Sequence, residues 1–290
     1  EPLLQQSLQI REETLGDAHP LFVQSKEDLA ILKWKKKDIS AATVLYREVM
    51  EKTLDFVNRY FPPLSEAEKT RYWDLLSPRF ERFYNFAIDA ASNTKELVND
   101  MLEYRLATKG LLLSSTKKVN EAILNSGNQK LIRDYTDWLD SKEQLTALYA
   151  YSKEDLQEQS INVDSLEKAT NAMEKRLSES SKEFSQFFFT SKTKMTDLQK
   201  ELKADEAVVE IIRLRQFYQV LTDQCRYAAL IISKTGTEPV LQLLPNGNDM
   251  EGKHAKTYRL SMKNKSPDEN SYTQFWAPLD ASVKGKKKIW

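Results

Sequence analysis

Cysteine and histidine are the side chains from which a thiol-based catalytic site would be built, and this sequence has few of either. It contains one cysteine, Cys225, and two histidines, His19 and His254. A cysteine nucleophile needs a neighbouring base, most often histidine, to take up its proton, and backbone donors to stabilise the oxyanion. The pair to consider is therefore Cys225 with His254.

The local sequence argues against this pair. Cys225 lies in TDQCRYA, just ahead of a predicted strand, whereas catalytic groups of open α/β sheets lie beyond the carboxyl ends of strands. His254 lies in EGKHAKT, a polar linker with no strand immediately before it. We interpret Cys225 as a free thiol at a strand entrance and His254 as a solvated loop residue. We therefore predict no catalytic residue in this chain.

Other chemistry has still less support. The sequence has no C-x-x-C or H-E-x-x-H spacing for zinc, and no G-x-x-x-x-G-K-[ST] or G-x-G-x-x-G loop for nucleotides. We interpret His19 as a turn residue, and carboxylate pairs such as Glu66/Glu68 and Glu12/Glu13 as solvated or capping charges. We expect no metal site and no cofactor.

The charge composition bears on the class of partner. Lys and Arg together number 43, as do Asp and Glu, so no overall field favours nucleic acid or an anionic membrane. We interpret the basic runs WKKK (34–37) and KGKKKIW (284–290) as solvated. No apolar stretch is long enough to span a membrane, and a single cysteine fits a reducing compartment. We expect a protein or peptide partner, no nucleic acid, no membrane, and a cytoplasmic location.

The first part of the chain repeats itself. Residues 1–12 overlay 43–54 at an offset of 42, and their shared apolar positions follow the stripe of an amphipathic helix. A second helix is predicted between the copies, at about 20–36. Helix pairs that cannot bury their apolar faces alone stack on their neighbours, as in a solenoid.

Helical patterns continue without regular repetition from about residue 52 to 190. Pro62-Pro63 is predicted to end one helix, and Ser65 with Glu68 forms a capping box that opens the next. That helix, 66–90, contains Pro78 as an expected kink and carries an apolar face. Further helices are predicted at about 95–125, 129–152 and 164–187, the last with an Asp164/Glu167 box. The expected apolar face of 66–90 consists of Tyr72, Leu75, Leu76, Phe80, Phe83 and Phe86.

The pattern changes near residue 205. A short helix, 196–203, is predicted with Thr196 and Gln199 as its capping box, and three β-rich runs follow at 207–214, 226–233 and 240–245. The last two are expected to form a hairpin, and the run AALII indicates a strand buried on both faces. A polar stretch, 246–267, then leads to a helix at 272–283.

These segments carry a family resemblance. SLQIREETLGDAHP with DLAILKWKKKDISAATVLYREVM resembles long tetratricopeptide (TPR) repeats of the kinesin-light-chain kind, with Lys37 where a glycine is usual. Together with LSEAEKTRYWDLLSPRFERFYNFA, NDMLEYRLATKGLLL, DLQKELKADEAVVEIIRL and RYAALIISKTGTEPVLQLL, they resemble bacterial TPR–CHAT proteins, in which repeats and a helical connector precede a caspase-like CHAT domain. The resemblance implies a mainly α chain divided into repeats (1–57), connector (58–192) and the front of a CHAT sheet (193–290).

The resemblance also implies a function. The chain would be a non-catalytic scaffold that binds a protein or peptide partner on its repeat/connector face. Its parent would be a partner-regulated cysteine peptidase whose His and Cys turns lie beyond residue 290. The chain has no initial Met and begins as if within a helix, and its three predicted strands make a poor free-standing domain. We therefore expect it to be cut from a longer protein at both ends. One alternative is an adaptor whose CHAT-like domain has no dyad. Another is a self-contained α+β enzyme, which an exposed edge strand near Val240 would argue against.

Overall fold

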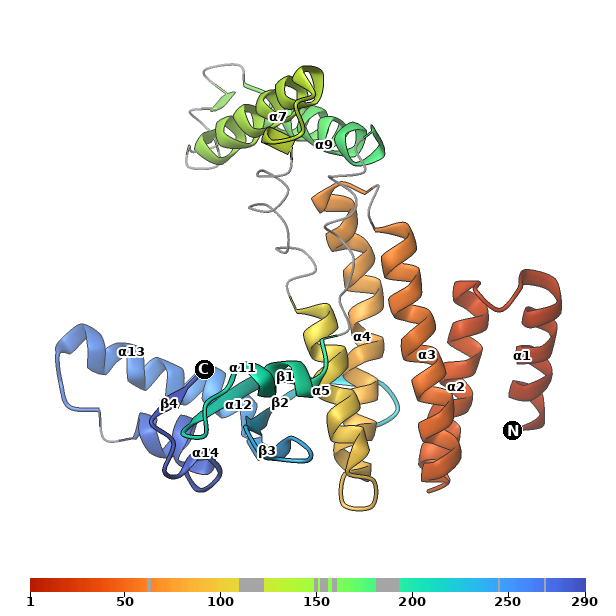
Figure 1. Cartoon of the computed structure of the whole chain (residues 1–290), viewed down its shortest axis with the longest axis vertical. Helices are drawn as coiled ribbons and strands as arrows, with labels where there is room; N and C mark the ends of the chain where they lie inside the picture. The colour runs from red at the N-terminus through yellow and green to blue at the C-terminus, as the bar shows by residue number, and fades with distance from the viewer. Residues whose placement is uncertain are drawn as a thin grey trace. The chain divides into compact units, whose positions relative to one another are not determined.

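The computed structural model describes residues 1–61, 64–109, 123–148, 151, 156–157, 161–180, 193–244, 246–268 and 270–290. These residues are mainly helical, with a four-stranded mixed sheet (Figure 1). They form two compact units. Unit 1 comprises 1–50, 77–109 and 191–290, and unit 2 comprises 51–76 and 110–190. Part of the predicted connector, 77–109, thus packs with the repeats and the sheet.

The predicted repeat helices are present. Helices α1 (Pro2–Leu15), α2 (Pro20–Lys35) and α3 (Ile39–Tyr60) follow one another, and Phe22, Val23 and Val49 form a small core with Leu8 against it. His19 caps α2, because its Nδ1 accepts the Leu21 N–H at 3.2 Å. Lys37, in the turn before α3, has the left-handed φ of 65° that glycine adopts more easily.

Aromatic rings form the core beside the repeats. Helix α4 (Glu66–Ala90) contains Pro78, and its part from Ser77 onward belongs to unit 1 together with α5 (Glu96–Thr108). Tyr46 of α3 stacks on Phe86 of α4 at 4.8 Å between centroids. Of the predicted apolar face of α4, Phe80, Phe83 and Phe86 are buried, but Leu75 is 76% exposed and Tyr72 44%. The periodicity correctly predicted the buried aromatic residues of this face. It did not predict that Tyr72 and Leu75, in the first half of the helix, are exposed.

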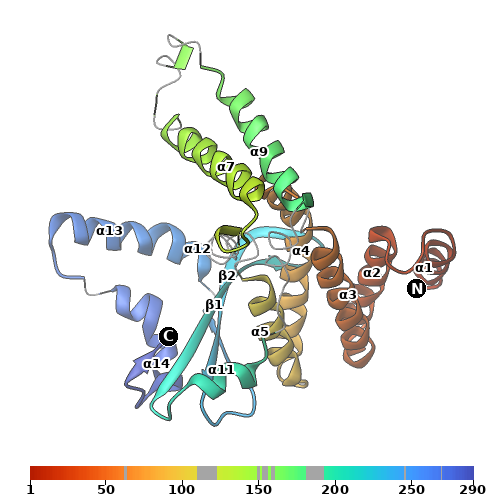
Figure 2. The ribbon, with the colours of Figure 1, turned by 45° about the horizontal axis from the view of Figure 1, so that its top comes forward.

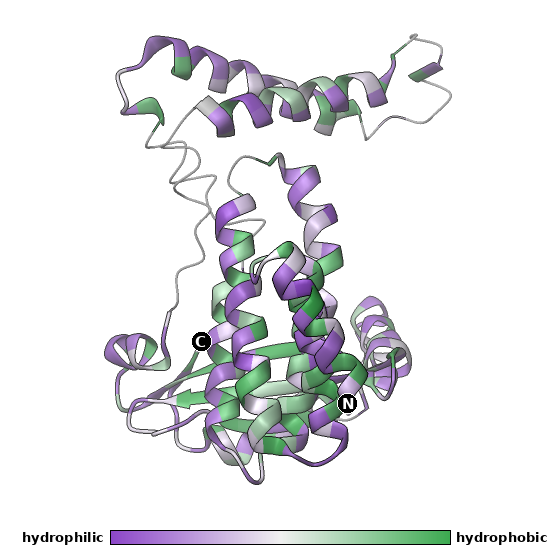
Figure 3. Ribbon diagram, turned by 90° about the vertical axis from the view of Figure 1, so that its right-hand side faces the viewer, coloured by the Kyte–Doolittle hydropathy of each residue, from purple (hydrophilic) through white to green (hydrophobic). Residues whose placement is uncertain are grey.

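The three predicted strands are confirmed and a fourth joins them. The sheet has the order β3-β2-β1-β4, formed by β1 (Glu206–Phe217), β2 (Leu221–Ser233), β3 (Val240–Leu244) and β4 (Lys288–Ile289). The expected β2–β3 hairpin is present, β1 and β2 form a longer antiparallel hairpin, and β4 runs parallel to β1. The five residues 228–232 are all buried, as their apolar run predicted. In Figure 3 the strands carry the broad hydrophobic bands of this unit.

The polar stretch 246–267 was expected to be a linker, and this was wrong. It contains a continuous helical segment made of α12 (Gly247–Asp249), the π-helix η1 (Met250–His254) and α13 (Ala255–Asn264). Its two glycines and several lysines interrupt the apolar periodicity from which a helix is predicted. The helix predicted at 272–283 is confirmed as the π-helix η2 (Tyr272–Trp276) followed by α14 (Ala277–Val283), which packs on the sheet through Leu279 and Val283.

Helix α11 (Met195–Glu201) is present but uses a different capping box from the one predicted. Asp197, rather than Gln199, accepts the backbone N–H of the N-cap residue, Lys194, at 3.1 Å. Gln199 instead donates to the carbonyls of Ser233 and Gly236 at 2.8 and 2.7 Å, so it ties α11 to the β2–β3 turn.

Unit 2 is a small helical body. Helices α7 (Gln129–Leu148) and α9 (Val163–Ser180) enclose a core of Ile123, Leu131, Tyr135, Trp138 and Leu177. The Ser65/Glu68 capping box is confirmed in both directions, at 3.0 and 3.3 Å. Helix α9, however, is capped by Asn162, whose Oδ1 accepts the Ser165 N–H, and not by Asp164. Pro62-Pro63 and the predicted helical residues 110–122 and 181–187 lie outside the described residues.

Candidate functional site

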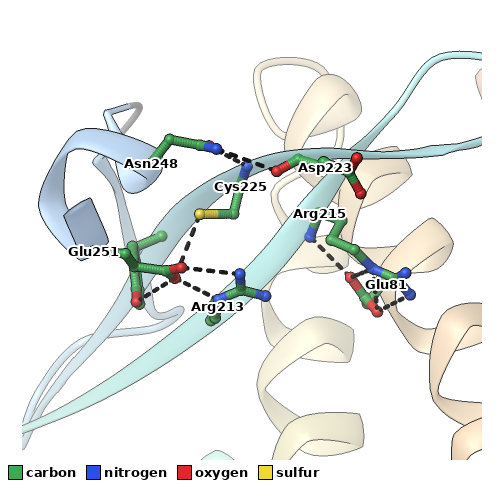
Figure 4. Close-up of polar contacts among 8 residues, drawn as sticks. Glu81, Arg213, Arg215, Asp223, Cys225, Asn248 and Glu251 are labelled. Atoms are coloured by element: carbon green, nitrogen blue, oxygen red, sulfur yellow. Dashed lines mark hydrogen bonds and ion pairs between the residues drawn. The ribbon is translucent and has the colours of Figure 1, made fainter.

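Polar side chains from the two strands β1 and β2 converge at Glu251 of η1 (Figure 4). The β1–β2 register places Arg213 opposite Tyr227. Cys225 precedes Tyr227 by two residues and therefore lies on the same face of β2. The Tyr227 hydroxyl donates to Glu251 Oε1 at 2.8 Å, and the Cys225 thiol lies 3.4 Å from the same oxygen. Arg213 holds the carboxylate with two N–H groups, one of them 3.1 Å from Oε2.

Close backbone contact at Gly247 positions Glu251 on the helical segment. A Cβ on Gly247 would lie 2.5 Å from the Cys225 carbonyl oxygen, so only glycine allows α12 to approach β2 this closely. The next residue, Asn248, accepts the Cys225 N–H at 2.6 Å and donates to the Asp223 carbonyl at 3.2 Å. These contacts bring Glu251, about one turn later, over the thiol.

The electrostatics of the cluster disfavour a reactive thiolate. The hydrogen bonds from Arg213 and Tyr227 lower the pKa of Glu251 to about 2, so this carboxylate stays ionised at neutral pH. Burial and the hydrogen bond to Glu251 raise the pKa of Cys225, whose side chain is 1% exposed. A thiol that donates to a carboxylate and is closed to solvent is neither a good nucleophile nor an accessible metal ligand.

Cys225 and His254 do not lie in the local structures predicted from the sequence. Cys225 lies inside β2, not at a strand entrance as expected, because β2 begins at Leu221. His254 lies in η1, not in a loop, and its ring meets Phe275 edge-on at 6.4 Å. The partner of Cys225 is thus a carboxylate, whereas His254 packs on an aromatic ring. The predicted absence of a catalytic residue remains a prediction.

The carboxylate pairs have the roles expected of helix charges. Glu13 accepts from Gln9 one turn earlier at 2.9 Å, and Glu68 caps α4. Glu66 forms an ion pair with Lys142 at 2.5 Å. Among the residues that the structure describes, no group of three or more His, Cys, Asp or Glu side chains could hold a metal ion. Within the same ranges, no helix has the length and apolar character needed to cross a membrane.

A second set of contacts links the repeat helices to α4. Glu27 of α2 is fully buried, and its carboxylate accepts hydrogen bonds from Arg79 at 3.0 Å and from Arg82 at 2.6 Å. Trp34, near the C-terminal end of α2, stacks on Phe217 of β1 at 5.8 Å and meets Phe86 edge-on at 5.7 Å. Helix α2 therefore contacts both α4 and the end of the sheet.

Helices α4 and α5 form hydrogen bonds and ion pairs with strand β1 of the sheet. Glu81 accepts the backbone N–H of Arg215 at 2.8 Å and its guanidinium at 2.7 Å. Asn85 donates to the Arg215 carbonyl at 2.8 Å and accepts from the Phe217 N–H at 3.2 Å. Near the other end of β1, Glu210 accepts from Arg105 and Lys109 of the α5 region at 2.8 and 2.5 Å.

Sequence reasoning missed these linking residues. The available signals were a carboxylate, Glu27, within an apolar helix, and charges alternating with apolar residues at Arg213 and Arg215 in a strand. Comparison with known proteins adds no identification: no family model, no curated protein and no solved structure matches the chain.

Proposed function

We propose that this chain is a protein-interaction scaffold, built of TPR-type hairpins and a helical connector, that continues into the front of a caspase-like CHAT domain. The chain itself is non-catalytic. Its parent is a bacterial, partner-regulated cysteine peptidase with its His/Cys dyad beyond residue 290. The support is the sequence resemblance, the paired helices α1–α3, and a mixed sheet that starts with two antiparallel hairpins.

The observation that carries this proposal is the contact between repeat and sheet within unit 1. The ring of Trp34, on repeat helix α2, lies on Phe217 at the end of β1, and Glu27 of the same helix is clamped by α4. A partner that docks on the repeats would bind the same body that carries the sheet. A partner that moves α2 would also move β1, because Trp34 packs on Phe217. This contact supports regulation by docking on the repeats.

Two other functions have less support. An adaptor whose CHAT-like domain has no dyad would use the same contacts, and only the parent's activity separates it from a peptidase. A self-contained α+β enzyme would be expected to have a closed sheet. The sheet is instead open, with β3 at one edge, and Val240 on that strand is 52% exposed.

The proposed scaffold function can be tested by measuring partner binding. Leu21 and Val44 are apolar side chains on repeat helices, 49% and 56% exposed, so Leu21→Lys with Val44→Lys adds charge without opening a core. We expect the double variant to lose the partner captured by the parent protein and to lose partner-stimulated peptidase activity. Leu124→Lys, at a side chain 51% exposed in unit 2, is the matched control. Equal partner capture and stimulation by the repeat variant and the control would refute the proposal.

A further inference from the structure

The charge of the chain is distributed unevenly along its length. The whole sequence has a net charge of zero, but residues 251–290 contain nine Lys or Arg and four Asp or Glu, a net charge of +5. The described acids of this segment are already engaged. Glu251 binds Arg213, Asp268 accepts the Asn270 and Ser271 backbone N–H groups, and Asp280 accepts the Tyr272 hydroxyl. Lys287 pairs with Asp205 outside the segment, and the other cations carry the positive charge that a partner can meet.

Helix α13 concentrates this charge on an exposed surface. It buries no residue, and in Figure 2 it extends from the edge of unit 1 away from α2–α5. Within the described residues, none of its basic side chains or those next to its ends forms an ion pair. These five exposed cations are Lys253, Lys256, Arg259, Lys263 and Lys265. Five unpaired cations on about 18 Å of helix attract a polyanion.

Large apolar side chains are exposed among these cations. Tyr258, Leu260 and Met262 are 44%, 48% and 62% exposed. Elsewhere in residues 251–290, Tyr272 is 57% and Trp290 60% exposed. A nucleic acid backbone or an acidic peptide would use the charges but leave most of this apolar area in water. A bilayer surface uses both, because its headgroups bind the lysines while Tyr, Trp, Leu and Met enter the boundary with the acyl chains.

We propose that α13 and its flanking residues form a docking surface for an anionic lipid membrane, bound peripherally. Lysine outnumbers arginine four to one among the five cations, which favours diffuse attraction to a charged surface over the paired hydrogen bonds that arginine makes to one carboxylate or phosphate. This inference does not depend on the peptidase or the repeats. It would place the scaffold at a membrane surface.

Vesicle flotation of the whole chain tests the proposal. We expect binding to phosphatidylcholine vesicles that contain phosphatidylserine, little binding to pure phosphatidylcholine, and loss of binding at high salt. Changing Lys256, Arg259 and Lys263 to Gln should weaken the partition coefficient by about 100-fold. A matched control changes three exposed cations of unit 2 that form no ion pair with the described residues, Arg71, Arg133 and Lys168, and should bind normally.

A second variant distinguishes lipid from other polyanions. Leu260→Ser with Met262→Ser keeps every charge, and should weaken vesicle binding at least several-fold while leaving any binding to a DNA duplex unchanged. Circular dichroism checks that each variant is folded. Equal binding to charged and neutral vesicles, equal losses for the α13 variant and its control, or no effect of the Leu260/Met262 change would each overturn the proposal.

Discussion

Arg215 and Glu81 are joined through both side chain and backbone. The Glu81 carboxylate accepts hydrogen bonds from the Arg215 backbone N–H at 2.8 Å and from its guanidinium at 2.7 Å. One residue of α4 therefore binds both the backbone and the charged side chain of one residue of β1. The β1–β2 ladder has its irregularity directly after this residue, between Arg215 and Phe217. The helix thus supplies a hydrogen bond at the point where the strand pairing breaks down.

Loss of the Glu81 carboxylate should destabilise unit 1. We expect Glu81→Ala to reduce the free energy of unfolding by about 2 kcal/mol, because a charged acceptor of several hydrogen bonds is removed. Urea unfolding measures the change, and a double-mutant cycle with Arg215→Met should give a coupling of about 1 kcal/mol or more. A coupling near zero would mean that the pair does not hold the sheet.

Glu27 should contribute more to stability than the more exposed ion pair between Lys26 of α2 and Glu48 of α3. Glu27→Gln leaves Arg79 and Arg82 without their common carboxylate in a buried site, at a cost of about 3 kcal/mol or more. Lys26 pairs with Glu48, which is 46% exposed, so Glu48→Gln is the control and should cost less than about 1 kcal/mol. Similar midpoints of thermal unfolding for the two variants would contradict this ranking.

Cys225 should be unreactive in the folded protein. Its side chain is buried, and its raised pKa leaves little thiolate at neutral pH. We expect labelling by a thiol reagent to be at least about tenfold slower than in the chain unfolded by urea, and Cys225→Ser to leave any peptidase activity of the parent unchanged. Rapid labelling of the native chain, or loss of activity in a folded Cys225→Ser protein, would show that the thiol has a role.

Acid should weaken the Glu251 cluster. The pKa of Glu251 is lowered from 4.5 to about 2, so its stabilising effect is complete above pH 4.5 and is lost as the pH falls from 4.5 towards 2. Comparison of wild type with Glu251→Gln over this range isolates the effect. The stability difference between the two proteins should shrink as the pH falls. A constant difference would mean that Arg213 and Tyr227 do not favour the ionised carboxylate.

Alkali should strengthen unit 2 through Lys69. This side chain is 1% exposed, and burial lowers its pKa from 10.5 to about 8, so the cost of its buried charge is relieved as the pH rises from about 8 towards 10.5. The free energy of unfolding of wild type, relative to Lys69→Met, should therefore increase between pH 8 and 10. A flat difference would show that the Glu66, Glu68 and Glu174 carboxylates near Lys69 keep its pKa at the ordinary value.

Helices and strands could be predicted where their pattern was local. The 42-residue offset located α1 and α3, and the run at 228–232 correctly predicted a strand buried on both faces. Strands β1 and β2 extend beyond the predicted runs 207–214 and 226–233, where Arg215 meets Glu81 and Cys225 meets Asn248 from elsewhere in the sequence. Long-range partners decided these boundaries.

The candidate site was less predictable than the fold. The sequence suggested asking whether Cys225 meets His254, but it gave no indication that the thiol would face Glu251, which lies in a stretch expected to be a linker. The zero net charge likewise hid the +5 of residues 251–290, because equal totals say nothing of where charges lie. The charge of separate segments is the more useful quantity.

The close contact at Gly247 makes the helical segment that follows it a lever. The segment runs from Gly247 to Asn264, roughly 25 Å at the usual rise per residue. Its inner end is fixed where a single added carbon would collide with Cys225, and its outer end carries the cations of α13. From this length, a tilt of about 5° at the inner end moves the outer end by about 2 Å. Small shifts in β2 would therefore be magnified at α13.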